Sequence, residues 1–204
     1  MTGAETMRSD HLAVLAGTLG DGAEWLSSVL GVTPGAIGRH ARMGTWNRLL
    51  SLGREEYLEV IAVDPDAPAP DRPRWFGLDG FRGPPRLGNW IVACDLSSEA
   101  LPGAGEVLAF ERGAYRWSMA VPADGCLPFD GLQPAQIEWQ GPHPAPALED
   151  RGCRLRRLSL VHPRAADLRA RLSRLTDPRL VIEAGPAPAL RAEIDTPSGL
   201  RVLG

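Results

Sequence analysis

The hydrophobic pattern is most regular over residues 45–63, TWNRLLSLGREEYLEVIAV. An apolar run reaches the polar turn GREE at residues 53–56, and the chain that follows is rich in β-branched and aromatic side chains. This pattern predicts two strands joined in a hairpin. Because strand side chains alternate between faces, Tyr57, Glu59 and Ile61 are expected to share one face of the second strand.

The same reading predicts further elements on both sides of the hairpin. Before it, we expect a strand over residues 11–17, a helix over residues 20–30 with Asp21 as its cap, and a strand or edge loop over residues 32–44. After it, a short capped segment begins at Ser97. The strands expected beyond the hairpin cover residues 89–95, 106–112, 115–121 and 135–140.

Prolines interrupt the pattern over residues 65–87. Proline removes a backbone donor and restricts the residue before it, so this stretch is predicted to be a connecting loop. Its aromatic residues Trp75, Phe76 and Phe81 are too apolar for a free linker. We therefore expect the loop to lie folded over another part of the molecule.

A repeat is visible in the spacing of two predicted strand pairs. His11 and Glu59 are 48 residues apart, and so are Trp90 and Glu138, which predicts an internal repeat with an offset of 79 residues. A third, shorter unit follows from Cys153, with a strand, a helix and further strands. The expected organisation is one compact domain with modules at residues 8–64 and 88–145, the connecting loop at 65–87 and a partial module at 152–204.

Composition narrows the class of protein. The chain has 204 residues, 44% hydrophobic content and a net charge of −3, which predicts a globular core and no nucleic-acid partner. Three scattered cysteines, Cys94, Cys126 and Cys153, predict neither a disulfide framework nor a metal motif. No stretch approaches the roughly 18 apolar residues of a membrane span. We expect a cytoplasmic protein with no membrane partner.

Glu59 is the first candidate for chemistry because it shares a strand face with apolar neighbours. Burying an unpaired charge costs several kcal/mol, so such a carboxylate needs a partner or a function. The alternative is that Glu59 faces solvent or pairs with an arginine across the sheet.

Several stretches together resemble one protein family. DHLAVLAG, GRHARMGTWNRLLSLG, YLEVIAVDP, RPRWFGLD, PFDGLQPAQIEW and GPHPA resemble the bacterial glyoxalase-like domain proteins of the vicinal oxygen chelate (glyoxalase/bleomycin resistance/dioxygenase) superfamily. The resemblance implies an α+β fold in which paired βαβββ modules form a half-open barrel around a pocket. A shorter C-terminal β-α-β unit is expected beside it.

The resemblance also implies a metal site. Superfamily ligands come from the first and last strand of each module, and these positions match His11, Glu59, Trp90 and Glu138. Trp90 cannot ligate, because an indole N–H is only a donor. The expected ligands are therefore His11, Glu59 and Glu138, holding a divalent metal (Zn²⁺, Mn²⁺, Mg²⁺ or Fe²⁺).

Other residues are candidates for substrate binding. His40 and Asn47 lie in the stretch that carries the resemblance, and four tryptophans offer an aromatic lining, namely Trp46, Trp75, Trp90 and Trp139. For each there is a structural alternative. His40 could be a hydrogen-bonding or surface residue, Asn47 could close a turn, and the tryptophans could be plain core.

Two functions remain open from the sequence. The first is a metal-assisted lyase, isomerase or dioxygenase acting on a small oxygenated metabolite, with Glu59 or Glu138 as the catalytic base. The second is a non-catalytic protein that binds a drug or metabolite in an aromatic cleft. A homodimer with an interface in the C-terminal unit is a third possibility, and whether the chain is an enzyme stays open.

Overall fold

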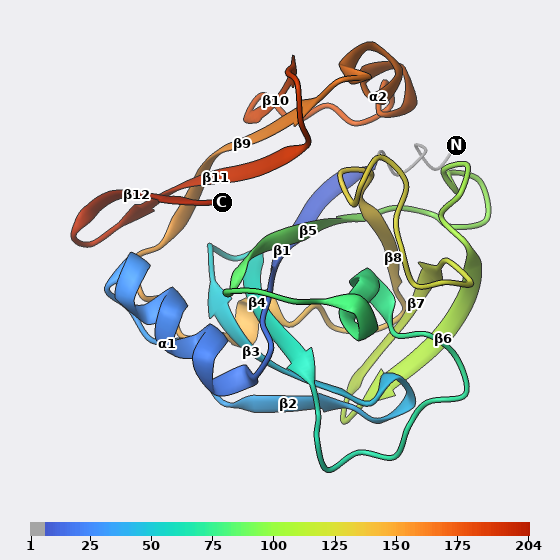
Figure 1. The fold of residues 1–204 in the computed structure, drawn as a ribbon. Coiled ribbons are helices and arrows are strands. Elements are labelled where there is room, and N and C mark those ends of the chain that lie inside the picture. The colour runs from blue at the N-terminus through green and yellow to red at the C-terminus, as the bar shows by residue number, and fades with distance from the viewer. Residues whose placement is uncertain (1–6) are drawn as a thin grey trace.

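An eight-stranded sheet that curls into a nearly closed barrel dominates the computed structural model, which describes residues 7–204 (Figure 1). The strand order is β2-β3-β4-β1-β5-β8-β7-β6. The first half comprises β1 (Arg8–Leu15), α1 (Leu19–Leu30), β2 (Ile37–His40), β3 (Thr45–Ser51) and β4 (Tyr57–Val63). The second half comprises β5 (Arg86–Ala93), β6 (Glu106–Arg112), β7 (Tyr115–Val121) and β8 (Ala135–Trp139).

The two halves repeat the same topology. β1 pairs parallel with β4, β5 pairs parallel with β8, and the antiparallel β1–β5 ladder joins the halves. This confirms the predicted α+β fold of two modules in a half-open barrel. The second half differs from the first at one place, because residues 96–98 form turns where the first half has α1.

The helix α1 covers the outside of the first module. Its cap is Thr18, whose Oγ1 accepts a hydrogen bond from the backbone N–H of Asp21, so the expected cap at Asp21 is corrected to Thr18. Gly31 ends the helix in the left-handed conformation, with φ 73°. The buried side of α1 packs on β4 and β3. No helix within residues 7–204 has the length and apolar character needed to cross a membrane.

The proline-rich stretch lies folded against the barrel as predicted. It contains the short 3-10 segment η2 (Trp75–Gly80), in which Trp75 and Phe76 are buried. Two further 3-10 turns, η1 (Ala41–Met43) and η3 (Ala145–Ala147), lie in other connections.

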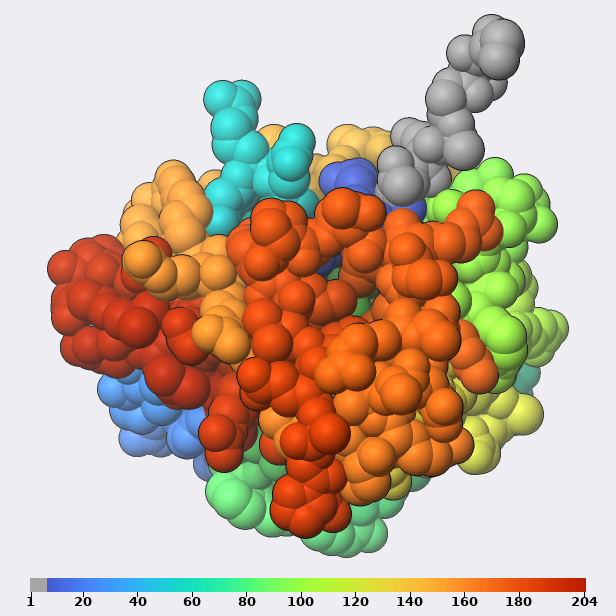
Figure 2. All heavy atoms as spheres, turned by 90° about the horizontal axis from the view of Figure 1, so that it is seen from above, coloured from blue at the N-terminus to red at the C-terminus, as the bar shows by residue number. Residues whose placement is uncertain are grey.

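The C-terminal unit forms a separate four-stranded sheet with order β10-β9-β11-β12. It contains the strand, helix and further strands expected after Cys153, which makes it larger than the β-α-β unit expected beside the barrel, and its strand order differs from that of the two modules. Its atoms lie over one face of the barrel in the view from above (Figure 2). The elements are β9 (Arg154–His162), α2 (Ala165–Arg171), β10 (Leu180–Ala184), β11 (Ala189–Thr196) and β12 (Gly199–Leu203).

The alternation of strand side chains divides the apolar residues between two cores. One core lies inside the barrel and includes Ala13, Ile61 and Ile137. The other lies on the barrel's outer side and joins it to α1 and the C-terminal sheet, with Trp90 and Leu158 among its members. Full burial of one large aliphatic side chain stabilises the fold by about 1.5–3 kcal/mol, so both cores contribute strongly.

Candidate functional site

A narrow cavity inside the barrel collects most of the polar residues that point inward. The cavity and its mouth enclose about 370 Å³ of empty space, of which only about 30 Å³ is wide enough to admit water. That space holds roughly two waters, and a larger ligand requires side chains to move. The lining consists of His11, His40, Asn47, Tyr57, Glu59, Trp75, Phe76, Arg112, Trp117, Met119, Ile137 and Trp139.

The buried carboxylate of Asp10 orients the imidazole ring of His11. A register shift between Ser9 and His11 interrupts the β1–β5 ladder at this point. The carboxylate of Asp10 is fully buried and lies 2.5 Å from His11 Nδ1, while Trp139 Nε1 donates to it at 2.9 Å and His143 Nε2 lies 3.1 Å away. An ionised Asp10 holds the proton of His11 on Nδ1, so Nε2 is left for the cavity.

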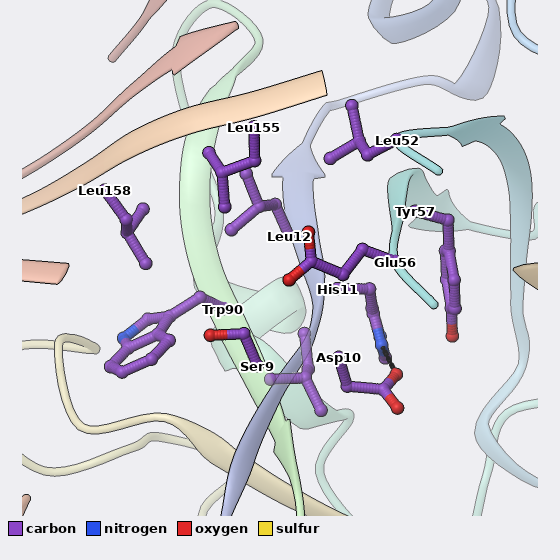
Figure 3. A pocket seen from close by; sticks show the side chains of 11 residues that line it. Ser9, Asp10, His11, Leu12, Leu52, Glu56, Tyr57, Trp90, Leu155 and Leu158 are labelled. Carbon is purple, nitrogen blue, oxygen red and sulfur yellow. Dashed lines mark hydrogen bonds and ion pairs between the residues drawn. The ribbon is translucent and has the colours of Figure 1, made fainter. Parts of the chain in front are cut away.

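The charge of Asp10 follows from its partners. Burial by itself raises the pKa of this carboxyl, but the hydrogen bonds with His11 and His143 outweigh burial and hold the pKa well below its ordinary range. The ring of His11 also stacks on Tyr57 (Figure 3), and the two ring centroids are 4.3 Å apart. Burial, followed by the charges of Asp10 and Glu59, raises the pKa of Tyr57.

Glu59 is held by a hydrogen-bond network that crosses between the modules. Asn47 Nδ2 donates to Glu59 Oε1 at 2.6 Å, and Arg112 Nη1 donates to Asn47 Oδ1 at 3.1 Å. Arg112 lies on β6, so a residue of the second module is linked to Glu59 of the first through Asn47. Glu59 is 4% exposed, so its carboxyl group is buried and hydrogen-bonded rather than solvated.

His40 belongs to the same network as a neutral side chain. Its Nδ1 lies 3.1 Å from Thr45 Oγ1, and its Nε2 lies 3.4 Å from Arg112 Nη1. Burial lowers the pKa of His40 to about 3, and the charges of Arg112 and His11 add to the effect. Neutral His40 therefore serves as a hydrogen-bond acceptor toward Arg112.

Trp75 offers the cavity an unused donor. Its side chain is buried, packs edge-on against His40 with centroids 5.1 Å apart, and its Nε1 has no hydrogen-bond partner among the described residues. A buried donor without a partner costs about 1–3 kcal/mol. A ligand oxygen in the cavity would satisfy it.

The donors do not fit the expected divalent metal site. His11 Nε2 and His40 Nε2 lie 3.8 and 3.9 Å from the Glu59 oxygens, and within residues 7–204 no three His, Cys, Asp or Glu side chains are grouped to hold one ion. The Arg112 guanidinium lies 3.4 Å from His40 Nε2, so a cation held by that nitrogen would be close to this positive charge. Of the expected ligands, the first module brings His11 and Glu59 to the cavity, and the second module brings none.

Six of the predicted site residues meet at this cavity, namely His11, His40, Asn47, Glu59, Trp75 and Trp139. Glu138 does not reach it. Ile137 and Trp139 line the cavity, so the side chain between them points to the opposite face, where its Oε2 accepts from the Leu96 backbone N–H at 3.4 Å.

Trp46 and Trp90 also lie outside the cavity. Trp46 packs against the outer core, and the Arg39 guanidinium lies 5.5 Å from its ring centroid. Trp90 is buried between the barrel and β9, and its Nε1 donates to the Leu132 carbonyl at 2.9 Å. Figure 3 shows the side chain of Trp90 beside Leu158, away from His11.

The register of the strands explains these placements. Ala13 pairs with Glu59 in the first module and Ala93 pairs with Ile137 in the second, so equivalent positions are 80 and 78 residues apart. The predicted offset of 79 differs by one residue from each of these values. A slip of one residue moves a side chain to the other face of a sheet. The second-module counterparts of His11 and Glu59 are Ile91 and Ile137.

Asp10, Tyr57 and Arg112 are site residues that the sequence reasoning did not select. Tyr57 shares its strand face with Glu59, so alternation could have found it. Asp10 is next to His11, but the register shift in β1 hides from the alternation pattern that its side chain belongs to the site. Arg112 has no sequence signal, because it contacts Asn47, which lies 65 residues earlier in the chain.

Comparisons with known proteins agree with this architecture. A hypothetical protein from Staphylococcus aureus matches with a TM-score of 0.57 and 13% identity, over 89% of this chain and 87% of that one. Methylmalonyl-CoA epimerase from Mycobacterium tuberculosis matches with a TM-score of 0.43 and 14% identity, over 67% and 87%. A search of curated proteins returned no match.

The fold, with its two modules around a central cavity, is that of the vicinal oxygen chelate superfamily, to which glyoxalase-like domains belong. A family model described as a glyoxalase-like domain matches residues 9–176, which is most of the chain. The chain belongs to the glyoxalase-like domain family.

Proposed function

We propose that this protein is a lyase or isomerase that moves a proton on a small oxygenated metabolite, with Glu59 as the base. The observation that carries the proposal is the position of Glu59, a buried carboxylate at a cavity whose other wall is apolar. Asn47 holds one oxygen of Glu59 at 2.6 Å, so the carboxylate has a defined orientation. Orientation of the base is the first requirement for general-base catalysis.

The neighbours of Glu59 suit a reaction at a carbon next to a carbonyl group. Glu59 would take the proton from carbon, and the electron pair would move to the carbonyl oxygen. Trp75 Nε1, which lacks a partner within residues 7–204, and the Arg112 guanidinium are donors available to that oxygen. His11, oriented by Asp10, is a second acid–base group that could return the proton.

A metal-assisted form of the same reaction is the second candidate. Two histidines and one carboxylate face one cavity, and their separations of 3.8 and 3.9 Å are not far above those of a chelate. Such an ion would be held by His11, His40 and Glu59 after they draw together. The present donor geometry favours the metal-free form, as does the guanidinium of Arg112 beside His40.

The test is hydrogen exchange into small 2-oxo and 2-hydroxy acids and aldehydes in D₂O, followed by NMR. Glu59→Gln keeps the hydrogen-bonding shape but removes the base, so we expect exchange to slow by about 10²–10⁴-fold. Glu138→Gln makes the same change on the opposite strand face and should leave the rate unaltered.

Three results would contradict the proposal. Equal exchange by wild type and the Glu59→Gln variant would remove Glu59 from the reaction. Exchange that disappears after dialysis against EDTA and returns with one divalent metal would favour the metal-assisted form. Tight binding of a compound without any exchange would instead favour a binding protein, which the apolar wall of Met119, Trp117 and Ile137 also suits.

A further inference from the structure

A second, larger hollow lies between the barrel and the C-terminal sheet. It is bordered by the starts of β5 and β11, the loop before β8 and the C-terminal Gly204, and its volume is about 890 Å³. We call it the arginine groove, because Arg86, Arg164 and Arg191 line it. The groove and the barrel cavity share one lining residue, Phe76, and otherwise have separate walls.

Among the charged side chains that line the arginine groove, three are positive and one is negative, and Gly204 with its terminal carboxylate also lines it. All three arginines are exposed, and none has a carboxylate within ion-pair distance in the part of the chain that the structure describes. Asp130 is the single acidic residue among the groove's lining residues, and its Oδ2 lies 3.0 Å from His162 Nε2. The chain as a whole carries a charge of −3, so this concentration of positive charge is local.

Aromatic rings position two of the guanidinium groups. The Arg164 guanidinium lies 4.6 Å from the ring centroid of Phe129, and that of Arg86 lies 4.4 Å from the centroid of Phe81. Stacking on a ring leaves the N–H edges of a guanidinium available to donate, and in Arg86 one of these donors, Nη1, already bonds the Arg82 carbonyl at 3.1 Å. The guanidinium groups of Arg86 and Arg164 are therefore partly oriented before any ligand binds.

The backbone of the groove is strained. Phe76, Phe129 and Asp130 have φ values of 60°, 56° and 55°, and they are the three non-glycine residues with positive φ within residues 7–204. All three line the arginine groove. Bulky residues rarely adopt this conformation, which costs of order 1–3 kcal/mol and is concentrated at functional sites in proteins.

Backbone hydrogen bonds hold the strained loop in place. Gly131 N donates to the Leu127 carbonyl at 3.1 Å, and Leu132 N donates to the Phe129 carbonyl at 3.0 Å. Gln133 N donates to the Pro128 carbonyl at 3.1 Å. The loop that presents Phe129 and Asp130 to the groove is therefore well defined rather than loose.

We infer that the arginine groove binds a small organic anion that carries phosphate or carboxylate groups. The planar, always charged guanidinium matches both groups through paired N–H donors. A volume of about 890 Å³ suits a metabolite rather than a polymer. This site is independent of the reaction proposed for the barrel cavity, and its test requires no turnover.

The test measures binding of pyrophosphate and of citrate by isothermal titration calorimetry at low ionic strength. We expect at least one of them to bind, with Arg164→Ala and Arg191→Ala each weakening the affinity by about tenfold through loss of a charge-assisted hydrogen bond. Tighter binding of pyrophosphate would identify a phosphate ligand, and tighter binding of citrate a polycarboxylate. Far-UV circular dichroism checks that the variants fold.

Arg116→Ala is the matched control. Arg116 is exposed on β7 beside Glu111, outside the groove, so its removal changes net charge equally. We expect its affinity to stay within about twofold of wild type, because exposed charges far from a site are screened. The inference is overturned if neither anion binds, or if Arg116→Ala weakens binding as much as the groove variants do.

Discussion

At the residue scale, Asp10 organises one end of the barrel cavity. It takes hydrogen bonds from side chains that lie 129 and 133 residues further along the chain, Trp139 and His143, and it fixes the tautomer of its neighbour His11. A buried carboxylate with this many donors stabilises the fold only while it is charged. Its protonation therefore links the stability of the whole protein to pH.

Replacing Asp10 with asparagine should destabilise the protein at pH 7 by about 3 kcal/mol, because it breaks a buried charged network. The folded-state pKa is lowered from 3.8, so the wild-type carboxylate contributes stability above that value and loses it as the pH falls further. The gap between Asp10→Asn and wild type should thus narrow below about pH 4. Urea unfolding at pH 7 and at pH 3 measures it.

Asp71→Asn makes the same chemical change at an exposed carboxylate. It should shift the free energy of unfolding by less than about 0.5 kcal/mol at either pH. A gap for Asp10→Asn that stays constant, or widens, toward acid would show that Asp10 is not charged in the folded state.

At the element scale, close packing against the barrel, rather than helix propensity, holds α1 in place. Gly22 lies on its buried side, where a Cβ atom would come within 2.6 Å of Val60 Cγ1 and 2.7 Å of Ala16 Cβ. A Cβ atom added to Gly20 would have Thr18 Oγ1 as its nearest neighbour, at 3.8 Å. The two glycines share one helix but face different surroundings, so the pattern of small residues alone does not reveal which of them matters.

Gly22→Ala should lower the melting temperature. The overpacking costs about 1–3 kcal/mol and outweighs the gain of up to about 1 kcal/mol in helix propensity. Gly20→Ala, two residues earlier, should gain part of that propensity and leave the melting temperature unchanged or raised. Differential scanning calorimetry of both variants decides the matter, and a stabilising Gly22→Ala would mean that α1 does not sit tightly on β4.

At the scale of the whole molecule, the C-terminal sheet shares a core with the barrel. Leu158 on β9 packs in the same apolar cluster as Trp90 on β5, and Figure 3 shows the two side by side. All six tryptophans precede residue 140, so none lies in the C-terminal unit, and Trp90 reports on the contact between that unit and the barrel. A shared core predicts that the C-terminal unit and the barrel unfold together.

Leu158→Ala should therefore lower the free energy of unfolding by about 2–5 kcal/mol through the cavity that it creates. The shift should be equal by tryptophan fluorescence and by far-UV circular dichroism, in a single transition. Leu200→Ala, on β12 and 48% exposed, should shift stability by less than about 0.5 kcal/mol. An unchanged fluorescence transition for Leu158→Ala would show that the C-terminal unit is an independent domain.

The sequence by itself determined whatever depends on short-range periodicity. Alternation put Tyr57, Glu59 and Ile61 on one face, and the structure has them there. Prolines marked the loop that covers the barrel. The repeated order of strands predicted the duplication and placed His11 and Glu59 in one module, and the resemblance to glyoxalase-like domain proteins predicted the barrel.

Only the tertiary structure decided how the strands align with one another. Alternation has a period of two, so an error of one residue in the repeat was enough to place Trp90 and Glu138 on the wrong face. Register depends on bulges and loop paths, which local patterns do not encode. The approach of Arg112 to Asn47 and the gathering of three arginines in one groove arise from segments distant in sequence, and they exist only once the barrel has closed.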